Sequence, residues 1–268
     1  MHKKKTAEEL PNLLEHIDEF YKKLGDKKLS LFLDYDGTLT PIVNNPDEAK
    51  LSEKNKNIIS ELSKLIPIAI LSGRDRKDLK SKVGIESVIY AGSHGFDITG
   101  PNGLEMEHES KEDILPALDQ AEEELNEKLK NIDGVTVERK KYAIAVHYRN
   151  VNEDHIDLVK NTVDEVLDQQ DSLKKGGGKK IVELKPAINW HKGRALEWLT
   201  KHLDLDKQEN YQVFVGDDLT DEDGFEAIQE DGLGIIVGAH SEKTAASYKL
   251  QDTKQVTEFL EQLKKGLE

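Results

Sequence analysis

A short apolar run that ends abruptly in acidic residues constrains this chain more than any other feature. Residues 29–33 read as a buried β-strand, and Asp34, Tyr35 and Asp36 follow where that strand ends. Because side chains alternate along a strand, we expect Asp34 and Asp36 to point the same way and Tyr35 the opposite way. Adjacent carboxylates repel each other unless a cation offsets their charge. The pattern predicts a magnesium site with one aspartate left as a nucleophile, and the alternative is an acidic turn at Asp36-Gly37.

Short apolar segments alternate with helical patterns on both sides of a middle stretch of different character. The expected strands are residues 29–33, 67–71, 88–91, 212–215 and 234–237. Helical patterns, including residues 52–65, 76–83 and 193–203, lie between them. Strands separated by helices indicate βαβ units and a parallel sheet. We therefore predict an α/β core with a doubly wound, Rossmann-like parallel sheet.

The middle stretch reads as a separate α+β unit. Its expected elements are a long acidic helix over 111–129, strands over 134–138 and 142–148 that form a hairpin joined at 139–141, a helix over 154–167, a turn at 176–178 and a strand over 179–184. We predict that residues 1–102 and 186–268 form the catalytic core. Residues 103–185 are then an inserted cap that determines substrate specificity.

Composition excludes several classes of partner. Lys plus Arg is 38 and Asp plus Glu is 53, so the formal net charge is -15. Such an acidic surface repels nucleic acid and anionic membranes, and we expect neither as a partner. An anionic substrate then needs a local cation or a basic pocket. No apolar run approaches the ~20 residues of a membrane span, the start lacks an apolar leader and cysteine is absent, so we expect a cytoplasmic protein.

Polar residues follow several of the expected strands. Ser72-Gly73-Arg74, Gly92-Ser93-His94-Gly95 and the acidic stretch 216–223 each come after a strand, and Lys192 opens a helix. Each segment alone also fits an ordinary role: a helix cap, a turn histidine, a solvated helix start or a surface lysine. Open α/β sheets bind ligands at the carboxyl ends of their strands. The coincidence of acid, hydroxyl and lysine at that one edge favours an active site.

Four segments together resemble the motifs of the haloacid dehalogenase-like phosphatases. They are Asp34-Tyr35-Asp36-Gly37-Thr38-Leu39, Ser72-Gly73-Arg74, Lys192-Gly193 and Gly216-Asp217-Asp218-x-x-Asp221. The order and spacing match over essentially the whole chain, and the middle unit is similar to the α/β cap of that superfamily. The resemblance implies a phosphatase fold of core and cap.

A narrower resemblance is to the trehalose-6-phosphate phosphatase family. It rests on the extension of the first motif through Thr40-Pro41-Ile42, and on Gly92-Ser93-His94-Gly95, Val137-Glu138-Arg139-Lys140, Val146-His147-Tyr148-Arg149, Glu183-Leu184-Lys185-Pro186 and Trp190-His191-Lys192-Gly193. The chain departs from the family at Lys185, where arginine is more usual and bidentate grip is lost. It also departs at His191, where an acidic residue is usual beside the catalytic lysine.

The resemblance implies a covalent mechanism. Asp34 attacks the phosphorus and forms an aspartyl-phosphate, which divides a difficult hydrolysis into two easier steps. Asp36 protonates the departing sugar hydroxyl and then takes a proton from the water that cleaves the intermediate. Ser72 and Lys192 bind phosphoryl oxygens and offset their charge in the transition state.

The resemblance also implies a magnesium cofactor. A carboxylate oxygen of Asp34, the main-chain carbonyl of Asp36 and a carboxylate of Asp217 would bind Mg²⁺. Asp218 or Asp221 would hold the metal waters or orient Lys192, and the sequence leaves open which of the two contacts the metal.

Substrate binding is expected from both units. The expected residues are Arg74, Gly92, Ser93, His94 and Gly95 of the core and Glu138, Lys140, Arg149 and Glu183 of the cap. The alternative for each cap residue is a surface ion pair. The expected substrate is the small sugar phosphate trehalose 6-phosphate, with a trehalose-phosphate synthase as functional counterpart. Sucrose phosphate, a glycosylglycerol phosphate and mannosyl phosphoglycerate are alternative substrates, and a catalytically silent sugar-phosphate sensor is the alternative outside the enzymes.

Overall fold

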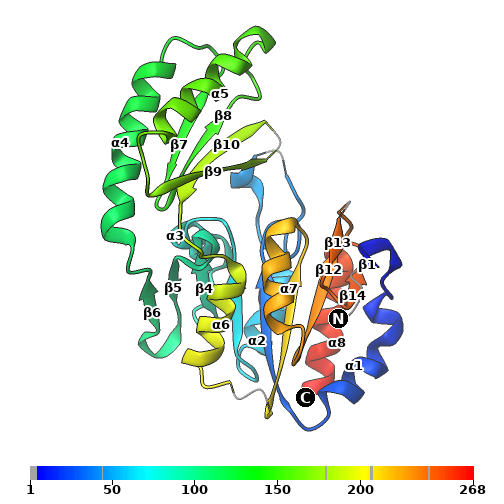
Figure 1. Ribbon diagram of the computed structural model, residues 1–268. Helices are drawn as coiled ribbons and strands as arrows, with labels where there is room; N and C mark the ends of the chain where they lie inside the picture. The colour runs from blue at the N-terminus through cyan, green and yellow to red at the C-terminus, as the bar shows by residue number, and fades with distance from the viewer. Residues whose placement is uncertain (1–4, 44, 179, 206–207, 241) are drawn as a thin grey trace. The chain divides into compact units, whose positions relative to one another are not determined.

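The computed structural model describes residues 5–43, 45–178, 180–205, 208–240 and 242–268. The chain divides into two compact units, one formed by Met1–Met106 and Trp190–Glu268 and the other by Glu107–Asn189 (Figure 1). The second unit begins and ends four residues later than the segment 103–185 expected as a cap. No helix within the described residues combines the length and the apolar character needed to cross a bilayer.

An eight-stranded sheet forms the centre of the first unit. In spatial order its strands are β14 (Tyr248–Leu250), β12 (Gly232–Val237), β11 (Asn210–Gly216), β2 (Lys28–Asp34), β3 (Ile68–Leu71), β4 (Ile89–Gly92), β5 (Asp97–Thr99) and β6 (Glu105–Glu107). The strands from β14 to β4 run parallel, and β5 is antiparallel to β4. The predicted doubly wound α/β core is therefore confirmed. A separate pair, β1 (Lys5–Thr6) and β13 (Lys243–Thr244), is antiparallel.

Helices bury both faces of this sheet. They are α1 (Ile17–Leu24), α2 (Glu53–Leu62), α3 (Arg76–Val83), α6 (Lys192–His202), α7 (Glu222–Ile228) and α8 (Thr253–Leu267). Leu31 and Leu33 pack into the hydrophobic cluster that contains residues of α1, α2, α3 and α8, whereas Phe32 packs into the cluster with α6 and α7. This alternation is what a strand buried on both faces requires. Short 3-10 turns lie at Ala7–Glu9, Leu13–His16, Pro46–Glu48, Ser93–Gly95, Pro101–Gly103 and Leu219–Asp221.

The second unit pairs an antiparallel sheet with two helices. Its strands, in the spatial order β7 (Thr136–Lys140), β8 (Ala143–His147), β10 (Ile181–Pro186) and β9 (Leu173–Gly178), accompany α4 (Lys111–Leu129) and α5 (Glu153–Leu167). The predicted hairpin is confirmed, with its turn at 141–142.

The turn predicted at 176–178 is wrong, because those glycines belong to β9 and pair with β10. A Cβ atom at Gly176 would lie 2.8 Å from Cε of Lys185, so the glycine leaves room for that lysine to cross the strand. The strand predicted over 179–184 begins at Ile181, and Lys179 itself lies outside the described residues.

Candidate active site

A buried lysine joins two acidic loops at the carboxyl edge of the core sheet. β2 ends at Asp34, and Lys192 is the first residue of α6. The Lys192 Nζ atom donates to Asp34 Oδ1 at 2.6 Å and to Asp221 Oδ1 at 2.7 Å. The Lys192 side chain is 3% exposed, so each charge in this set depends on the others. β11 lies directly beside β2, which is why the loop after β11 reaches Asp34.

The same edge carries a group of carboxylates able to hold a cation. Asp34, Asp217 and Asp221 each place one oxygen within 4.8 Å of the others, and this is the one such group among the described residues. Gly37 has a φ of +88°, and a Cβ atom there would lie 2.0 Å from Asp217 Oδ2. The Thr38 hydroxyl donates to Asp217 Oδ1 at 3.4 Å. An all-oxygen group of this kind suits a hard divalent ion such as Mg²⁺ or Ca²⁺.

Burial and mutual repulsion perturb these acids. Burial raises the pKa of Asp34 well above its ordinary value, Asp221 and Asp217 add to the rise, and Lys192 opposes it. Burial, with Asp221 and Asp218, raises the pKa of Asp217 to about 7. Burial alone would lower the pKa of Lys192, but Asp221 and Asp34 outweigh that effect and raise it. A cation at this site would relieve the repulsion among the carboxylates.

Without divalent cations, the protein is expected to lose stability as the pH rises from about 4 to about 7. The ordinary pKa of Asp217 is 3.8 and the folded protein raises it to about 7. Between those values the folded state holds a proton that the unfolded state has released, so the free energy of unfolding falls with pH. We expect a fall of roughly 2–4 kcal/mol, since each pKa unit corresponds to about 1.4 kcal/mol.

Thermal unfolding of chelator-treated protein between about pH 5 and pH 8 measures this effect. Asp217→Asn and added Mg²⁺ are each expected to flatten the profile, because each removes part of the repulsion. A melting temperature that rises across this interval, and that Asp217→Asn leaves unchanged, would contradict the electrostatic account.

Asp36 lies outside the carboxylate group and is bound by an arginine. β2 ends at Asp34, so the strand alternation expected to align Asp34 with Asp36 does not extend to Asp36. Its Oδ2 and Oδ1 atoms accept from Arg74 Nε and Nη2, each at 2.6 Å. Tyr35 is buried, and its hydroxyl donates to the Ala49 carbonyl at 3.1 Å. Burial raises the pKa of Tyr35 to about 12.

Two neighbouring loops after β3 and β4 hold each other in place. The Ser72 hydroxyl oxygen accepts from the Arg74 amide at 3.1 Å, and the Ser72 carbonyl accepts from the His94 amide at 2.8 Å. Ser93 N donates to the Arg74 carbonyl at 2.7 Å. Ser93, His94 and Gly95 have φ values of 49°, 56° and 92°, an unfavourable backbone for the first two. A Cβ atom at Gly95 would lie 2.2 Å from the Ala195 Cβ, which explains the glycine.

Two acidic residues in the segment after β11 make different contacts. The Asp218 Oδ1 atom accepts from the Thr220 amide at 2.8 Å and hydroxyl at 2.6 Å, so Asp218 caps the following turn. Asp221 is fully buried, and its Oδ2 accepts from the amides of Asp217 and Asp218. The sequence did not decide whether Asp218 or Asp221 orients Lys192. In the structure Asp221 contacts Lys192 and belongs to the carboxylate group.

The residue before the lysine contacts the neighbouring helix. His191 precedes α6, and its Nδ1 atom lies 3.4 Å from Asp223 Oδ2 on α7. A Cβ atom at Gly193 would lie 2.3 Å from the Asp223 carbonyl oxygen, so α6 and α7 meet closely here. Lys192 keeps both carboxylate partners with histidine at position 191.

Three of the four expected sugar-binding residues of the second unit share one sheet face. Glu138 and Glu183 both pair with Ala145 of β8, so their side chains point the same way. The Lys140 Nζ atom lies 3.1 Å from Glu183 Oε1. His147 Nε2 lies 2.8 Å from Glu138 Oε2. Arg149 is exposed in the turn after β8. Pairs of this kind also match the alternative of surface ion pairs.

The predicted set omitted residues that complete this site. Thr38, which contacts Asp217, and Asp78, which contacts Arg74, were both missed. Thr38 belongs to the Asp36-Gly37-Thr38 segment of the first motif, so its place in that motif could have indicated a role in the site. Asp78 lies on the expected helix, but Arg74 precedes that helix, so no helical spacing pointed to their ion pair.

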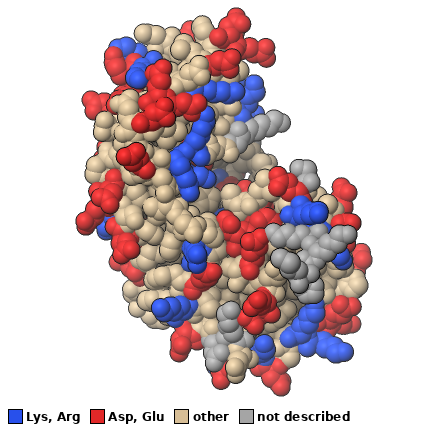
Figure 2. Space-filling model, in the orientation of Figure 1, with Lys and Arg blue, Asp and Glu red and all other residues tan. Residues whose placement is uncertain are grey.

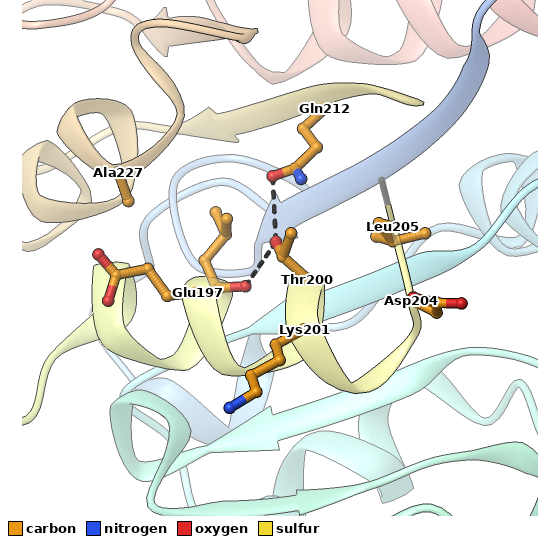
Figure 3. A pocket seen from close by; sticks show the side chains of 8 residues that line it. Glu197, Thr200, Lys201, Asp204, Leu205, Gln212 and Ala227 are labelled. Atoms are coloured by element: carbon orange, nitrogen blue, oxygen red, sulfur yellow. Dashed lines mark hydrogen bonds between the residues drawn. The ribbon is translucent and has the colours of Figure 1, made fainter. Parts of the chain in front are cut away.

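A hollow of about 590 Å³ lies elsewhere on the first unit, between α6, α7 and β11 (Figure 3). Thr200 and Gln212 both line it, and the Thr200 hydroxyl donates to Gln212 Oε1 at 3.2 Å. Gln212 lies near the amino end of β11, whereas the carboxylates follow the carboxyl end, and no predicted site residue lines this hollow. Figure 2 shows acidic side chains at many places on the visible face, with lysine and arginine between them.

Comparisons with known proteins agree with the resemblance to the trehalose-6-phosphate phosphatase family. A family model described as trehalose-phosphatase matches residues 32–254. "Probable trehalose-phosphate phosphatase E" of Arabidopsis thaliana is 38% identical over 266 residues, which cover 95% of this chain and 75% of that protein. The solved C-terminal domain of a Candida albicans trehalose-6-phosphate phosphatase is 26% identical with a TM-score of 0.78, covering 96% of this chain and 99% of that one. A haloacid dehalogenase-like hydrolase from Bacteroides thetaiotaomicron, 17% identical with a TM-score of 0.62 and covering 88% of this chain and 99% of that one, shares the fold.

Proposed function

The chain belongs to the trehalose-phosphatase family, and we propose that it hydrolyses trehalose 6-phosphate to trehalose and phosphate through an aspartyl-phosphate intermediate. The observation that carries this proposal is the buried lysine that joins Asp34 to Asp221 at the edge of the sheet. A lysine and two carboxylates buried together are costly for a protein to maintain. Such a set is typical of a site that handles charge.

Two displacements at phosphorus account for the reaction. Asp34 attacks the phosphoryl group, a bond from its carboxylate oxygen to phosphorus forms, and the bond to the trehalose oxygen breaks. Asp36 supplies the proton that makes the departing oxygen a neutral alcohol. Water then attacks the phosphorus of the aspartyl-phosphate, and Asp36 takes a proton from that water. The bond between phosphorus and the Asp34 oxygen breaks, which releases phosphate and restores the Asp34 carboxylate.

Lys192 and Ser72 are suited to bind phosphoryl oxygens. The Lys192 ammonium has three N–H donors and uses two of them on Asp34 and Asp221, so one remains for the substrate. The Ser72 oxygen accepts from the Arg74 amide, and its hydroxyl hydrogen has no partner among the described residues. Both groups would offset the negative charge of the phosphoryl group in the transition state.

We propose Mg²⁺ as the cofactor. The oxygen-only group of Asp34, Asp217 and Asp221 fits a hard divalent cation, and the raised pKa values of these acids reflect repulsion that a cation would relieve. Asp34, the main-chain carbonyl of Asp36 and Asp217 would hold the ion. When bound, it would supply positive charge to the phosphoryl oxygens. Asp218 caps the next turn, so Asp221 is the residue proposed to orient Lys192.

The proposed sugar site lies on the polar face of the cap sheet. Glu138, Lys140 and Glu183 offer charged groups on one face, and Arg149 is exposed beyond the end of β8. These groups suit the hydroxyls of a disaccharide phosphate. A cytoplasmic trehalose-phosphate synthase is the proposed functional counterpart, because it would supply the substrate.

Phosphate release from a panel of sugar phosphates, with and without Mg²⁺, tests this function. We expect strong preference for trehalose 6-phosphate and loss of turnover with a chelator, restored by Mg²⁺. The panel also contains sucrose phosphate, a glycosylglycerol phosphate and mannosyl phosphoglycerate. Preference for one of these would replace the substrate and keep the mechanism. Absence of metal-dependent release from every member would favour the silent sensor.

Substitution of Glu183 tests the cap. Glu183→Gln is expected to raise KM for trehalose 6-phosphate by about tenfold, because a hydrogen bond to a charged group contributes roughly 1.5–3 kcal/mol. It should leave hydrolysis of p-nitrophenyl phosphate, which has no sugar, nearly unchanged. Glu165→Gln is the matched control, since Glu165 also contacts a lysine in the same unit but lies on α5. Equal effects on both substrates would make Glu183 a structural residue.

A further inference from the structure

We propose that Arg74 is a positioning residue that holds the Asp36 carboxylate in place for proton transfer, an inference that rests on the proposed function. The sequence places Arg74 in a motif expected to bind substrate. The contacts of its guanidinium favour a different role, in which Arg74 acts on the reaction through Asp36.

The contact between the two side chains is a two-point fork. Arg74 Nε donates to Asp36 Oδ2 and Nη2 donates to Asp36 Oδ1, both at 2.6 Å. A guanidinium is planar and presents its N–H groups in fixed directions, so a paired fork fixes the plane of the carboxylate as well as its distance. A lysine at this position would supply charge without that control of orientation.

Arg74 is itself held from several sides. Its Nη1 atom donates to Asp78 Oδ2 at 3.0 Å, and Nη2 also donates to the Pro46 carbonyl at 2.9 Å. The guanidinium carbon lies 5.6 Å from the centroid of the Tyr35 ring. The Arg74 side chain is 12% exposed. These contacts, from three separate segments, make it a rigid support.

The same contacts leave little of Arg74 for the substrate. Four of its five N–H groups are engaged by Asp36, Asp78 and Pro46. Lys192 and Ser72 are better placed to bind the phosphoryl group, because each keeps a donor. Asp36 is 39% exposed, so without the fork its carboxylate would be free to take other orientations.

Loss of orientation has a specific kinetic consequence. The alkoxide of a sugar is a poor leaving group and depends on proton transfer from Asp36, whereas p-nitrophenolate leaves without a proton. A variant that misplaces Asp36 therefore slows formation of the aspartyl-phosphate from trehalose 6-phosphate and spares its formation from p-nitrophenyl phosphate. Cleavage of the intermediate needs Asp36 as the base for both substrates, so p-nitrophenyl phosphate should give a rapid burst of p-nitrophenolate followed by slow turnover. A variant that loses phosphate binding would weaken both reactions, chiefly through KM.

The experiment compares Arg74→Ala, Arg74→Lys, Asp36→Asn and the double variant Arg74→Ala/Asp36→Asn on both substrates with Mg²⁺. For trehalose 6-phosphate we expect Arg74→Ala to lower kcat by about 10²-fold, within the range of general acid catalysis, with KM changed less than about threefold. Arg74→Lys is expected to fall between Arg74→Ala and the parent. In the Asp36→Asn background, Arg74→Ala should have almost no further effect.

The rate of the first-turnover burst of p-nitrophenolate serves as the test of folding and is expected to stay within about threefold of the parent, because that step needs no proton from Asp36. Arg194→Ala is the matched control, because Arg194 forms an exposed pair with Glu197 on α6. If Arg74→Ala does not fold, Asp78→Asn removes one support of Arg74 and is expected to lower kcat for the sugar phosphate by a smaller factor, while the burst of p-nitrophenolate is retained.

Three results would overturn the inference: equal losses in the first step on both substrates in variants that fold, a rise in KM with kcat retained, or independent effects of Arg74→Ala and Asp36→Asn in the double variant. Failure of the proposed function gives a different result, since the parent protein would then not hydrolyse trehalose 6-phosphate. In that case the same comparison, made with the sugar phosphate that is hydrolysed, still tests Arg74.

Discussion

Replacement of Asp34 by asparagine is expected to lower turnover of trehalose 6-phosphate by at least about 10⁴-fold, the scale on which loss of a nucleophile acts. The amide has nearly the shape of the carboxylate but cannot form the acyl-phosphate. Asp34 is buried beside Asp217 and Asp221 and has a raised pKa, so removal of its charge relieves repulsion in the metal-free protein. The fold should therefore survive the substitution.

Phosphate release and thermal unfolding of Asp34→Asn measure the two expectations separately. Asp133→Asn is the matched control, because it makes the same chemical change at an exposed position of the second unit. Activity of Asp34→Asn within tenfold of the parent, in protein shown by mass to retain the amide, would remove Asp34 from the role of nucleophile.

Replacement of Lys192 by methionine is expected to lower both activity and stability. Turnover should fall by about 10³-fold, since removal of one preorganised donor in an active site typically costs 10²–10³-fold and Lys192 also carries charge. The change leaves Asp34 and Asp221 buried without their shared cation. Loss of one partner of a buried ion pair typically costs about 3–5 kcal/mol.

A second substitution separates these two effects. Lys192→Met combined with Asp221→Asn removes one uncompensated carboxylate, so urea unfolding should show part of the stability restored while activity stays low. If Lys192→Met alone unfolds at the urea concentration of the parent, the buried charges do not stabilise one another as described. If it keeps full activity, Lys192 does not bind the phosphoryl group.

The local pattern of the sequence was enough to predict the core sheet and the residues at its edge. The strand predicted over 29–33 is β2, and Asp34 ends it. Lys192 lies 158 positions further along the chain, yet the expected topology places it near the same edge. This works because a buried parallel sheet requires continuous apolar strands, and its ligands gather where those strands end.

Contacts decided by tertiary structure escaped prediction. The sequence offered Asp218 and Asp221 as equivalent candidates, and the short turn at Leu219–Asp221 decides between them by turning Asp218 into a cap. The fork between Arg74 and Asp36 joins residues 38 positions apart, which no local pattern specifies. The run of glycines in β9 suggested a turn. The reason for Gly176 is instead the Lys185 side chain of the neighbouring strand β10, a contact that the local sequence does not reveal.

The stereochemical course at phosphorus tests the central proposal most directly. Each in-line displacement inverts the configuration of the phosphoryl group, so two displacements restore it. The measurement follows hydrolysis of trehalose 6-phosphate that carries a chiral, isotopically labelled thiophosphate in isotopically labelled water. Attack by Asp34 followed by attack of water predicts net retention. Net inversion would mean that water attacks the substrate directly, and would contradict the aspartyl-phosphate intermediate.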